Sequence, residues 1–446
     1  MKKTTGFLLA LFLLSWSCQP DPNVEQDPLN AALEAAISQQ PGGKSGLRLP
    51  QDHDWSAFPQ DPRNPITAEK VQLGKLLFHE TGLAINPRLP QGMNRFSCAS
   101  CHHAGAGFQA GILQGLGEGG LGFGVAGESR DIDPNWPIDS IDVQPIRTPT
   151  SLNVAFQELM LWNGQFGSTG ANRNTSAQWT SGTPKAVNHL GYEGPEIQAI
   201  AGLKVHRMEV TEAILSTYGY LELFDQVFPD FARSERYTKE TAGLAIAAYE
   251  RSVVANRSPF QQWLRGDVLA LSEAQKRGAV LFFGKAACGG CHQGPALNSM
   301  EFYALGMNDL VGPGTYGTSG NAADNTNLGR GGFTGNPEEH YQFKVPQLYN
   351  LKGLSFLGHG GTFGSLREVV DYKNRAQAEN AKVPAHRLAS EFKALSLSDE
   401  EVDDLVEFLE EGLYDPNLER YVPATVYSGN CFPNADPMAQ VDQGCL

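Results

Sequence analysis

The sequence predicts a mainly α-helical fold made of two related units joined by long ordered loops. Several segments place apolar residues at helical spacing, and no stretch of any length shows the alternation typical of a strand. Two of the helical segments, TAEKVQLGKLLF (67–78) and LSEAQKRGAVLFF (271–283), share one pattern. Gly74 aligns with Gly278, and a similar cysteine motif follows each segment, which indicates an internal repeat.

The remaining helices and loops follow from local signals. Ser272 with Gln275, and Ser398 with Glu401, form capping boxes that favour helix starts. Further helical segments are predicted at 30–38, 209–228, 238–254 and 398–413. Stretches rich in glycine at 104–127 and 306–338 are expected to be ordered loops.

Composition and charge limit the classes of function. The chain has 446 residues, of which 41% are hydrophobic and 19% are charged, as in an ordinary folded protein. Its net charge of −15 argues against a nucleic-acid partner, because binding phosphates needs a basic surface. Solubility explains this charge, and a basic electron-transfer partner is the alternative.

The N-terminus has the pattern of an export signal. Lys2 and Lys3 precede the apolar run Phe7–Leu14, which is too short to span a bilayer, and Cys18 follows. This pattern is similar to a bacterial lipoprotein signal in which Cys18 receives the lipid, although an ordinary secretory signal is the alternative. We therefore expect a protein of the periplasm or cell envelope, anchored to the membrane through lipid on Cys18 and a polar tether.

Six cysteines follow Cys18, and four of them form two Cys-x-x-Cys-His sets, the attachment signature of c-type haem. About 0.002 such sets per chain are expected by chance. Structural disulfides or zinc knuckles are the alternatives. The remaining two are expected to form a disulfide in an oxidising compartment. The first set is Cys98, Cys101 and His102, the second is Cys288, Cys291 and His292, and the tail pair is Cys431 and Cys445.

Ten stretches of the chain resemble the bacterial di-haem cytochrome c peroxidases and the related methylamine-utilisation di-haem enzymes. The resemblance covers residues 64–415 in the order found in that family. It rests on LGKLLF, SCASCHHAGAGF, TPTSLNVAF, LWNG, AAYERSVVANRSPFQQWLRG, ALSEAQKRGAVLF, CGGCHQG, FKVPQLYNL, GHGGTFGSLREVVDYKN and LSDEEVDDLVEFL.

This resemblance implies two cytochrome c-like haem domains within five segments. The segments are a signal peptide (1–18), a tether with an irregular segment (19–63), an N-terminal peroxidatic haem domain (64–240), a C-terminal electron-transfer haem domain (241–425) and a disulfide-closed tail (426–446).

The resemblance also implies a division of labour between the haems. The haem on His102 binds peroxide, the haem on His292 supplies electrons, and Trp162 lies between them. Many relatives cap the first iron with a histidine that here is replaced by Glu118, and no histidine occurs from 104 to 188. His103 is expected at the surface or against a haem propionate, so the first iron is expected to have an open face.

Three residues are candidates for the distal side of the first haem. Relatives place a glutamine and a glutamate ten residues apart, and the glutamate moves protons during O–O cleavage. Gln198 matches the glutamine. The position of the glutamate holds Met208, so that Glu209 or His206 is expected to take its role.

The resemblance places the sixth ligand of the second iron at Tyr372 or Lys373. A methionine ligand, which many relatives use, would have to be Met307 or Met300, since no methionine lies between 307 and 438. Oxygen or nitrogen ligands would lower the potential relative to methionine.

The resemblance also implies a role for two further positions, His359 and Arg147. His359 matches a histidine near the second haem, with a structural core histidine as the alternative. Relatives also hold calcium between the domains with an asparagine that here is Arg147. Carbonyl ligands at Lys344 and Pro346 remain, so calcium is left open.

Together these features predict a peroxidase that reduces hydrogen peroxide to water with electrons from a small donor protein of the cytochrome c or cupredoxin type. The first alternative is an oxidase of a larger substrate acting through high-valent iron. The second is a membrane-tethered electron carrier. A homodimer is compatible with the sequence.

Overall fold

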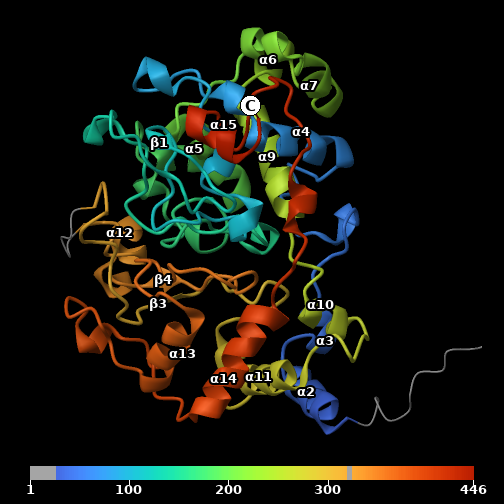
Figure 1. The fold of residues 1–446 in the computed structure, drawn as a ribbon, viewed down its shortest axis with the longest axis vertical. Helices are drawn as coiled ribbons and strands as arrows, with labels where there is room; N and C mark the ends of the chain where they lie inside the picture. Colours follow the sequence, from blue (N-terminus) through green and yellow to red (C-terminus); the bar gives the residue numbers. More distant parts are fainter. Residues whose placement is uncertain (1–26, 319–323, 446) are drawn as a thin grey trace, which may run out of the picture.

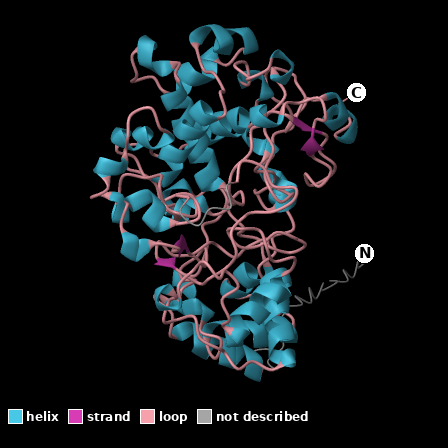
Figure 2. Ribbon diagram, turned by 90° about the vertical axis from the view of Figure 1, so that its left-hand side faces the viewer, coloured by secondary structure: helices cyan, strands magenta, loops and turns pink. Residues whose placement is uncertain are grey.

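The computed structural model describes residues 27–318 and 324–445. Within these ranges the chain is mainly helical, with long irregular loops and two very short pairs of strands (Figure 2), so the predicted fold class is confirmed at this level. The predicted signal peptide, Cys18 and residues 19–26 of the tether lie outside the described residues. No helix within the described ranges combines the length and apolar character needed to cross a bilayer.

Most helices gather in two groups (Figure 1). In the upper group α9 is central, because it is buried along almost its whole length and packs against both α4 and α5. The helices of this group are α4 (Ala68–His79), α5 (Gly194–Val205), α6 (Glu212–Tyr218), α7 (Leu221–Val227), α8 (Arg233–Arg236) and α9 (Lys239–Ser252).

In the lower group α11 is central, and it packs against α14 and α2. A π-helical turn, Phe408–Gly412, continues α14. The helices of this group are α2 (Pro28–Ser38), α3 (Gly43–Gly46), α10 (Pro259–Leu264), α11 (Glu273–Phe283), α13 (Leu366–Arg375) and α14 (Asp399–Glu407). Two short helices remain: α15 (Pro437–Asp442) lies with the upper group, and α12 (Arg330–Thr334) lies to one side of the middle of the molecule (Figure 1).

The two aligned glycines lie at equivalent helix contacts. A Cβ added to Gly74 in α4 would lie 1.9 Å from the carbonyl oxygen of Ala245 in α9. A Cβ added to Gly278 in α11 would lie 2.0 Å from the carbonyl oxygen of Asp404 in α14. Each glycine therefore lets its helix approach a partner backbone more closely than any other residue would allow.

The strands are two antiparallel pairs of two residues each. In the first pair β1 (Gly120–Leu121) faces β2 (Asp131–Ile132), with Gly120 opposite Ile132. In the second pair β3 (Phe302–Tyr303) faces β4 (Phe343–Lys344), with Phe302 opposite Lys344. These pairs tie down loops rather than form a sheet.

The predicted helices are largely confirmed, and both capping boxes are present at the starts of α11 and α14. The segment 209–228 was expected to be helical throughout, which is wrong. It contains α6 and α7, separated at Gly219, whose φ of +82° ends α6 in the left-handed conformation that glycine favours.

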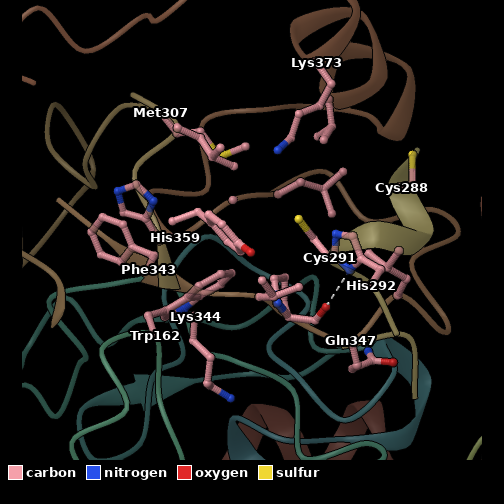
Figure 3. Close-up of a pocket in the computed structure, with 18 of the residues that line it drawn as sticks. Trp162, Cys288, Cys291, His292, Met307, Phe343, Lys344, Gln347, His359 and Lys373 are labelled. Carbon is pink, nitrogen blue, oxygen red and sulfur yellow. Dashed lines mark hydrogen bonds between the residues drawn. The ribbon is translucent and has the colours of Figure 1, made fainter. Parts of the chain in front are cut away.

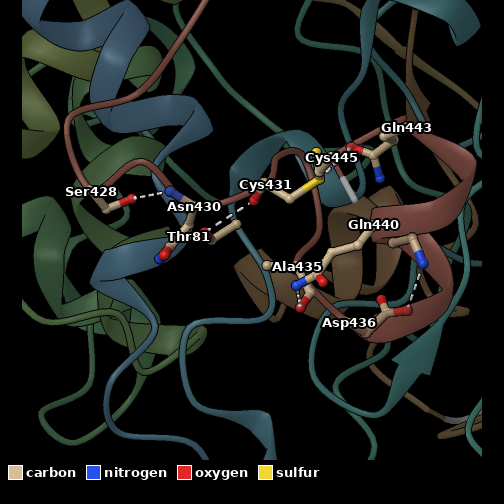
Figure 4. The surroundings of a disulfide bond; sticks show 10 residues. Thr81, Ser428, Asn430, Cys431, Ala435, Asp436, Gln440, Gln443 and Cys445 are labelled. Carbon is tan, nitrogen blue, oxygen red and sulfur yellow. Dashed lines mark hydrogen bonds between the residues drawn. A yellow bond between two sulfur atoms is a disulfide. The ribbon is translucent and has the colours of Figure 1, made fainter.

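The tail returns from α14 to the upper group and ends beside β1, with the predicted disulfide between Cys431 and Cys445 (Figures 1 and 4). Asp436 is fully buried and forms an ion pair with Arg130 at 3.1 Å. Asp442 accepts hydrogen bonds from the backbone N–H groups of residues 123 and 124. The tail therefore holds the glycine-rich loop that follows the first cysteine motif.

Replacing both Cys431 and Cys445 with serine should lower the free energy of unfolding by about 3 kcal/mol, the loss expected for a closed loop of about 15 residues. Denaturant unfolding followed by far-UV circular dichroism measures the change. Wild-type protein treated with reductant is the control and should unfold at the same midpoint as the variant. An unchanged midpoint in the double variant would contradict a stabilising role for the tail.

Candidate functional site: two haem-attachment turns

Both Cys-x-x-Cys-His motifs fold into the same short turn. Cys98–Ser100 and Cys288–Gly290 are single turns of 3₁₀-helix. In each turn the backbone N–H of the motif histidine donates to the carbonyl of the first cysteine, over 3.2 Å at His102 and 2.9 Å at His292. Each turn thus presents two thiols and an imidazole on one short loop, as covalent haem attachment requires.

The imidazoles of the two motifs are oriented alike. His102 Nδ1 lies 3.2 Å from Phe108 O, and His292 Nδ1 lies 3.0 Å from Leu297 O and 3.1 Å from Pro346 O. A carbonyl oxygen only accepts, so Nδ1 carries the proton and Nε2 keeps its lone pair. Burial lowers the pKa of both imidazoles to about 4, which keeps them neutral. A neutral imidazole with a free Nε2 is suited to bind iron.

The four motif cysteines are free thiols, so the alternative of structural disulfides at these motifs is wrong. Within the described ranges, no three His, Cys, Asp or Glu side chains converge as a metal-binding group, which does not support zinc knuckles. The thiol form is the one that adds to the vinyl groups of haem. The residues at both turns therefore fit a covalently attached haem.

A cavity of about 560 Å³ opens beside the second turn (Figure 3). Its wall includes Cys288, Cys291 and His292, together with apolar side chains from α11, α13 and α14. An apolar cavity with a buried imidazole matches what a haem needs, because the macrocycle is largely apolar.

The cavity separates the candidates for the sixth ligand of the second iron. Met307 and Lys373 line the cavity and point into it (Figure 3). Met307 Sδ lies beside Gly358, and a Cβ added to that glycine would meet the sulfur at an ordinary contact distance of 3.5 Å. Tyr372 is buried outside this lining, and its hydroxyl donates to Leu305 O. Met300 does not line the cavity.

Trp162 lies in the cavity wall, where its indole Nε1 donates to the carbonyl of Arg147 over 2.8 Å. Its ring meets the ring of His359 edge-on at 6.4 Å. His359 is buried, stacks on Phe343 at 3.7 Å, and places Nε2 3.4 Å from Asp309 Oδ1. His359 and Trp162 are therefore held together beside the second attachment turn.

The guanidinium of Arg147 is buried among carbonyl oxygens. It donates to Ala110 O at 2.6 Å, to Phe356 O at 3.0 Å and to Ile112 O. A further bond reaches Gln109 Oε1 at 3.3 Å. One cation thus joins the loop after the first turn to a loop that lines the cavity of the second.

Glu118, which the resemblance leads us to expect in place of a capping histidine, lies in the loop that follows the first turn. Its carboxylate is buried, accepting from Leu89 N at 3.0 Å and from Arg207 Nη2 at 2.8 Å. His103 is buried rather than at the surface, so the expectation of a surface position is wrong. Its Nε2 lies 2.7 Å from Ala126 O and fastens the glycine-rich loop.

His206 ends α5 and belongs to the same polar cluster. Its Nδ1 lies 2.8 Å from Asp142 Oδ2, which also accepts from Arg207 at 3.0 Å. Burial alone would lower the pKa of His206, but the Asp142 carboxylate outweighs this and raises it above its ordinary value of 6.5. A charge on His206 also contributes to lowering the pKa of His102, after the larger effect of burial.

Gln198 and Glu209 have different surroundings. Gln198 lies on α5, two turns before His206, and its buried Oε1 has no hydrogen-bond partner among the described residues. Glu209 forms an ion pair with Lys239 at 3.0 Å and accepts from Asn86 at 3.0 Å. The structure thus places Gln198 on α5 and His206 directly after the end of this helix, whereas Glu209 is paired with Lys239.

One carboxyl group near the first turn was not found by sequence reasoning. Glu250, on α9, is 3% exposed and accepts from the Ser151 hydroxyl, which lies close to His102. Burial raises the pKa of Glu250 to about 8. A carboxyl group directly after the apolar helix segment AIAAY is the signal that could have indicated it.

A mainly helical chain with two haem-attachment turns, each presenting a free imidazole nitrogen, has the features of a di-haem c-type cytochrome. Residues 68–268 match the model of the family described as di-haem cytochrome c peroxidase. Together with the two attachment turns, this match shows that the chain is similar to the di-haem cytochrome c peroxidases.

Two curated relatives show how far the similarity extends. Methylamine utilization protein MauG of Methylorubrum extorquens is 29% identical over 371 residues, which cover 82% of this chain and 83% of the relative. Cytochrome-c peroxidase IdrP1 of Denitromonas iodatirespirans is 29% identical over 401 residues, covering 86% and 91%. Among solved structures, a MauG-like protein associated with microbial copper homeostasis has a TM-score of 0.56 at 24% identity, covering 83% of this chain and 95% of that one.

Proposed function

We propose that this protein reduces hydrogen peroxide to water at the haem attached to Cys98, Cys101 and His102. Two electrons and two protons convert one peroxide molecule into two waters. A small donor protein, of the cytochrome c or cupredoxin type, supplies the electrons through the haem attached at His292. A haem attached at Cys98 and Cys101, with His102 on its iron, would supply the redox chemistry, and the polypeptide positions the peroxide and moves its protons.

The surroundings of Glu118 carry this proposal. The side chain that replaces the capping histidine of relatives is committed to Arg207 and Leu89 N, and no histidine occurs from 104 to 188. No imidazole of the glycine-rich loop therefore competes with peroxide for the iron. This favours a first haem that is ready to react as made.

Trp162 supports the proposed path between the haems. It lines the cavity beside the second turn, and its indole is bonded to Arg147, whose guanidinium reaches the loop after the first turn. The same guanidinium supplies a fixed positive charge at the position where relatives hold calcium. We propose that it takes the place of that ion, because its donors already satisfy nearby carbonyls.

We also propose that the two haem units are related repeats, spanning 64–240 and 241–425. Their equivalent turns and the matched contacts of Gly74 and Gly278 support this division. The pattern of residues 1–18 supports export to the periplasm or cell envelope and lipid anchoring through Cys18. A homodimer stays a prediction.

The second candidate function is oxidation of a larger substrate. The similarity to methylamine utilization protein MauG over most of the chain favours it. A third candidate, a tethered electron carrier, would need both irons to be fully ligated by the protein.

Absorption and electron paramagnetic resonance spectra of the purified ferric protein should show one high-spin and one low-spin haem. Peroxide should then oxidise reduced cytochrome c catalytically. The control is His102→Ala, which should keep the second haem and lose turnover. Two low-spin haems would favour the electron carrier. Spectral change with peroxide but no turnover would favour the larger substrate.

His206→Gln should lower kcat/KM for peroxide by about 100-fold or more, because His206 Nε2 would no longer move the peroxide proton. The matched control, Glu209→Gln, should have little effect, since Glu209 is paired with Lys239. An equal loss in the two variants, or a loss only in the control, would assign the role to Glu209.

His206 can act as a base only when it is neutral. Its raised pKa keeps it protonated up to a higher pH than an ordinary histidine. Steady-state rates across pH should therefore show kcat/KM falling as pH drops through a pKa above 6.5. Asp142→Asn removes the carboxylate that raises this pKa, so the acidic limb should move to lower pH. An acidic limb that stays at the same pH in Asp142→Asn would show that the His206–Asp142 pair does not supply the catalytic base.

We propose Met307 as the sixth ligand of the second iron, because a thioether needs no deprotonation. Lys373 would first have to lose a proton, although burial lowers its pKa to about 8. Met307→Ala should abolish the absorption band of methionine-ligated ferric haem and lower the midpoint potential of that haem. Lys373→Ala should preserve the band, and the reverse result would make Lys373 the ligand.

A further inference from the structure

A buried hydrogen-bonded chain lies behind the first attachment turn. The Ser151 hydroxyl is 3.4 Å from His102 Nδ1 and 3.2 Å from Glu250 Oε1. Ser151 is 3% exposed and Glu250 is 3% exposed. The second carboxyl oxygen of Glu250 has no hydrogen-bond partner among the described residues. A carboxyl group is therefore brought to the back of the imidazole through a single hydroxyl.

The direction of the hydrogen bonds follows from simple proton counting. With Nε2 of His102 on the iron, the only ring proton is on Nδ1, and it is shared between Phe108 O and Ser151 Oγ. The Ser151 hydroxyl has one proton of its own, and Glu250 is its acceptor. The chain therefore runs from His102 through Ser151 to Glu250, and each member donates to the next.

Among the residues that the structure describes, no such chain reaches the second haem histidine. Nδ1 of His292 faces two neutral carbonyls, Leu297 O and Pro346 O. The two otherwise equivalent imidazoles thus differ in one respect, the carboxyl group behind the first. Groups that accept from a ligand imidazole raise its basicity and strengthen its donation to the metal.

We propose that Ser151 and Glu250 are positioning residues that make His102 a stronger electron donor to iron than His292 is. Stronger donation stabilises the oxidised forms of the first iron and lowers its midpoint potential. The inference rests on the proposed function only in taking His102 as the ligand of the peroxide-binding haem.

The charges around Glu250 leave it available for this role. Its neighbour Arg251 is committed to Glu196 at 2.7 Å and Glu193 at 2.9 Å. Burial raises the pKa of Glu250 to about 8, the Ser151 hydrogen bond opposes this rise, and Glu196 adds to it. Measurements at pH 9 therefore compare an ionised carboxylate with its replacements.

The test uses Glu250→Gln and Ser151→Ala in the intact di-haem protein at pH 9. Spectroelectrochemistry gives the midpoint potential of each haem, and resonance Raman spectra of the reduced protein give the Fe–His stretching frequency of the first. Both variants should raise the potential of the first haem and lower its Fe–His frequency. The potential of the second haem should not move, which makes it an internal control.

Two more variants separate this role from general effects. Ser151→Thr keeps the hydroxyl and should restore values close to wild type. Glu80→Gln removes another buried carboxylate of the same helical group, one bonded to Tyr220 and Gly82 N, and should change neither haem.

An unchanged potential and Fe–His band in Glu250→Gln, in protein that retains both haems, would overturn the inference. Equal shifts of both haems, or equal shifts in Glu80→Gln, would also overturn it. Failure of the proposed function looks different, because wild-type protein would then lack peroxide turnover while these shifts of the first haem remained.

Discussion

The bond from each motif imidazole to a backbone carbonyl is the constraint on which the rest of the site depends. It decides which ring nitrogen carries the proton, and so leaves Nε2 free at both His102 and His292. The acceptors, Phe108 and Leu297, lie in the loops after the turns rather than in the turns themselves. The ligand geometry therefore depends on loops being held as firmly as helices, in a chain with very little sheet.

Buried arginine side chains hold several of these loops in place. Arg147 joins the loop after the first turn to a loop around the second cavity, and Arg130 joins the glycine-rich loop to Asp436 of the tail. Removing charges from water costs free energy unless they are paired, so each of these cations is surrounded by acceptors. The disulfide of the tail then limits how far the Asp436 segment can move.

Local signals in the sequence predicted the local structure well. The cysteine motifs, the capping boxes at Ser272 and Ser398, and the tail disulfide each depend on residues within a short stretch or on the elimination of other cysteines. Contacts between distant residues were not predicted. The burial of His103 by Ala126 and the bond of Ser151 to Glu250 join residues whose separation in sequence carries no pattern.

The two turns show how one local structure can serve two roles. Around the second turn the cavity is lined mainly by apolar side chains, and Met307 and Lys373 both enter it. Near the first turn lie acids and bases, His206 with Asp142 and Glu250 behind His102. An apolar environment favours the transfer of electrons with little reorganisation, whereas breaking an O–O bond requires protons to move. Under the proposed function, this difference in surroundings, rather than in the attachment turns, distinguishes the electron-accepting haem from the reacting one.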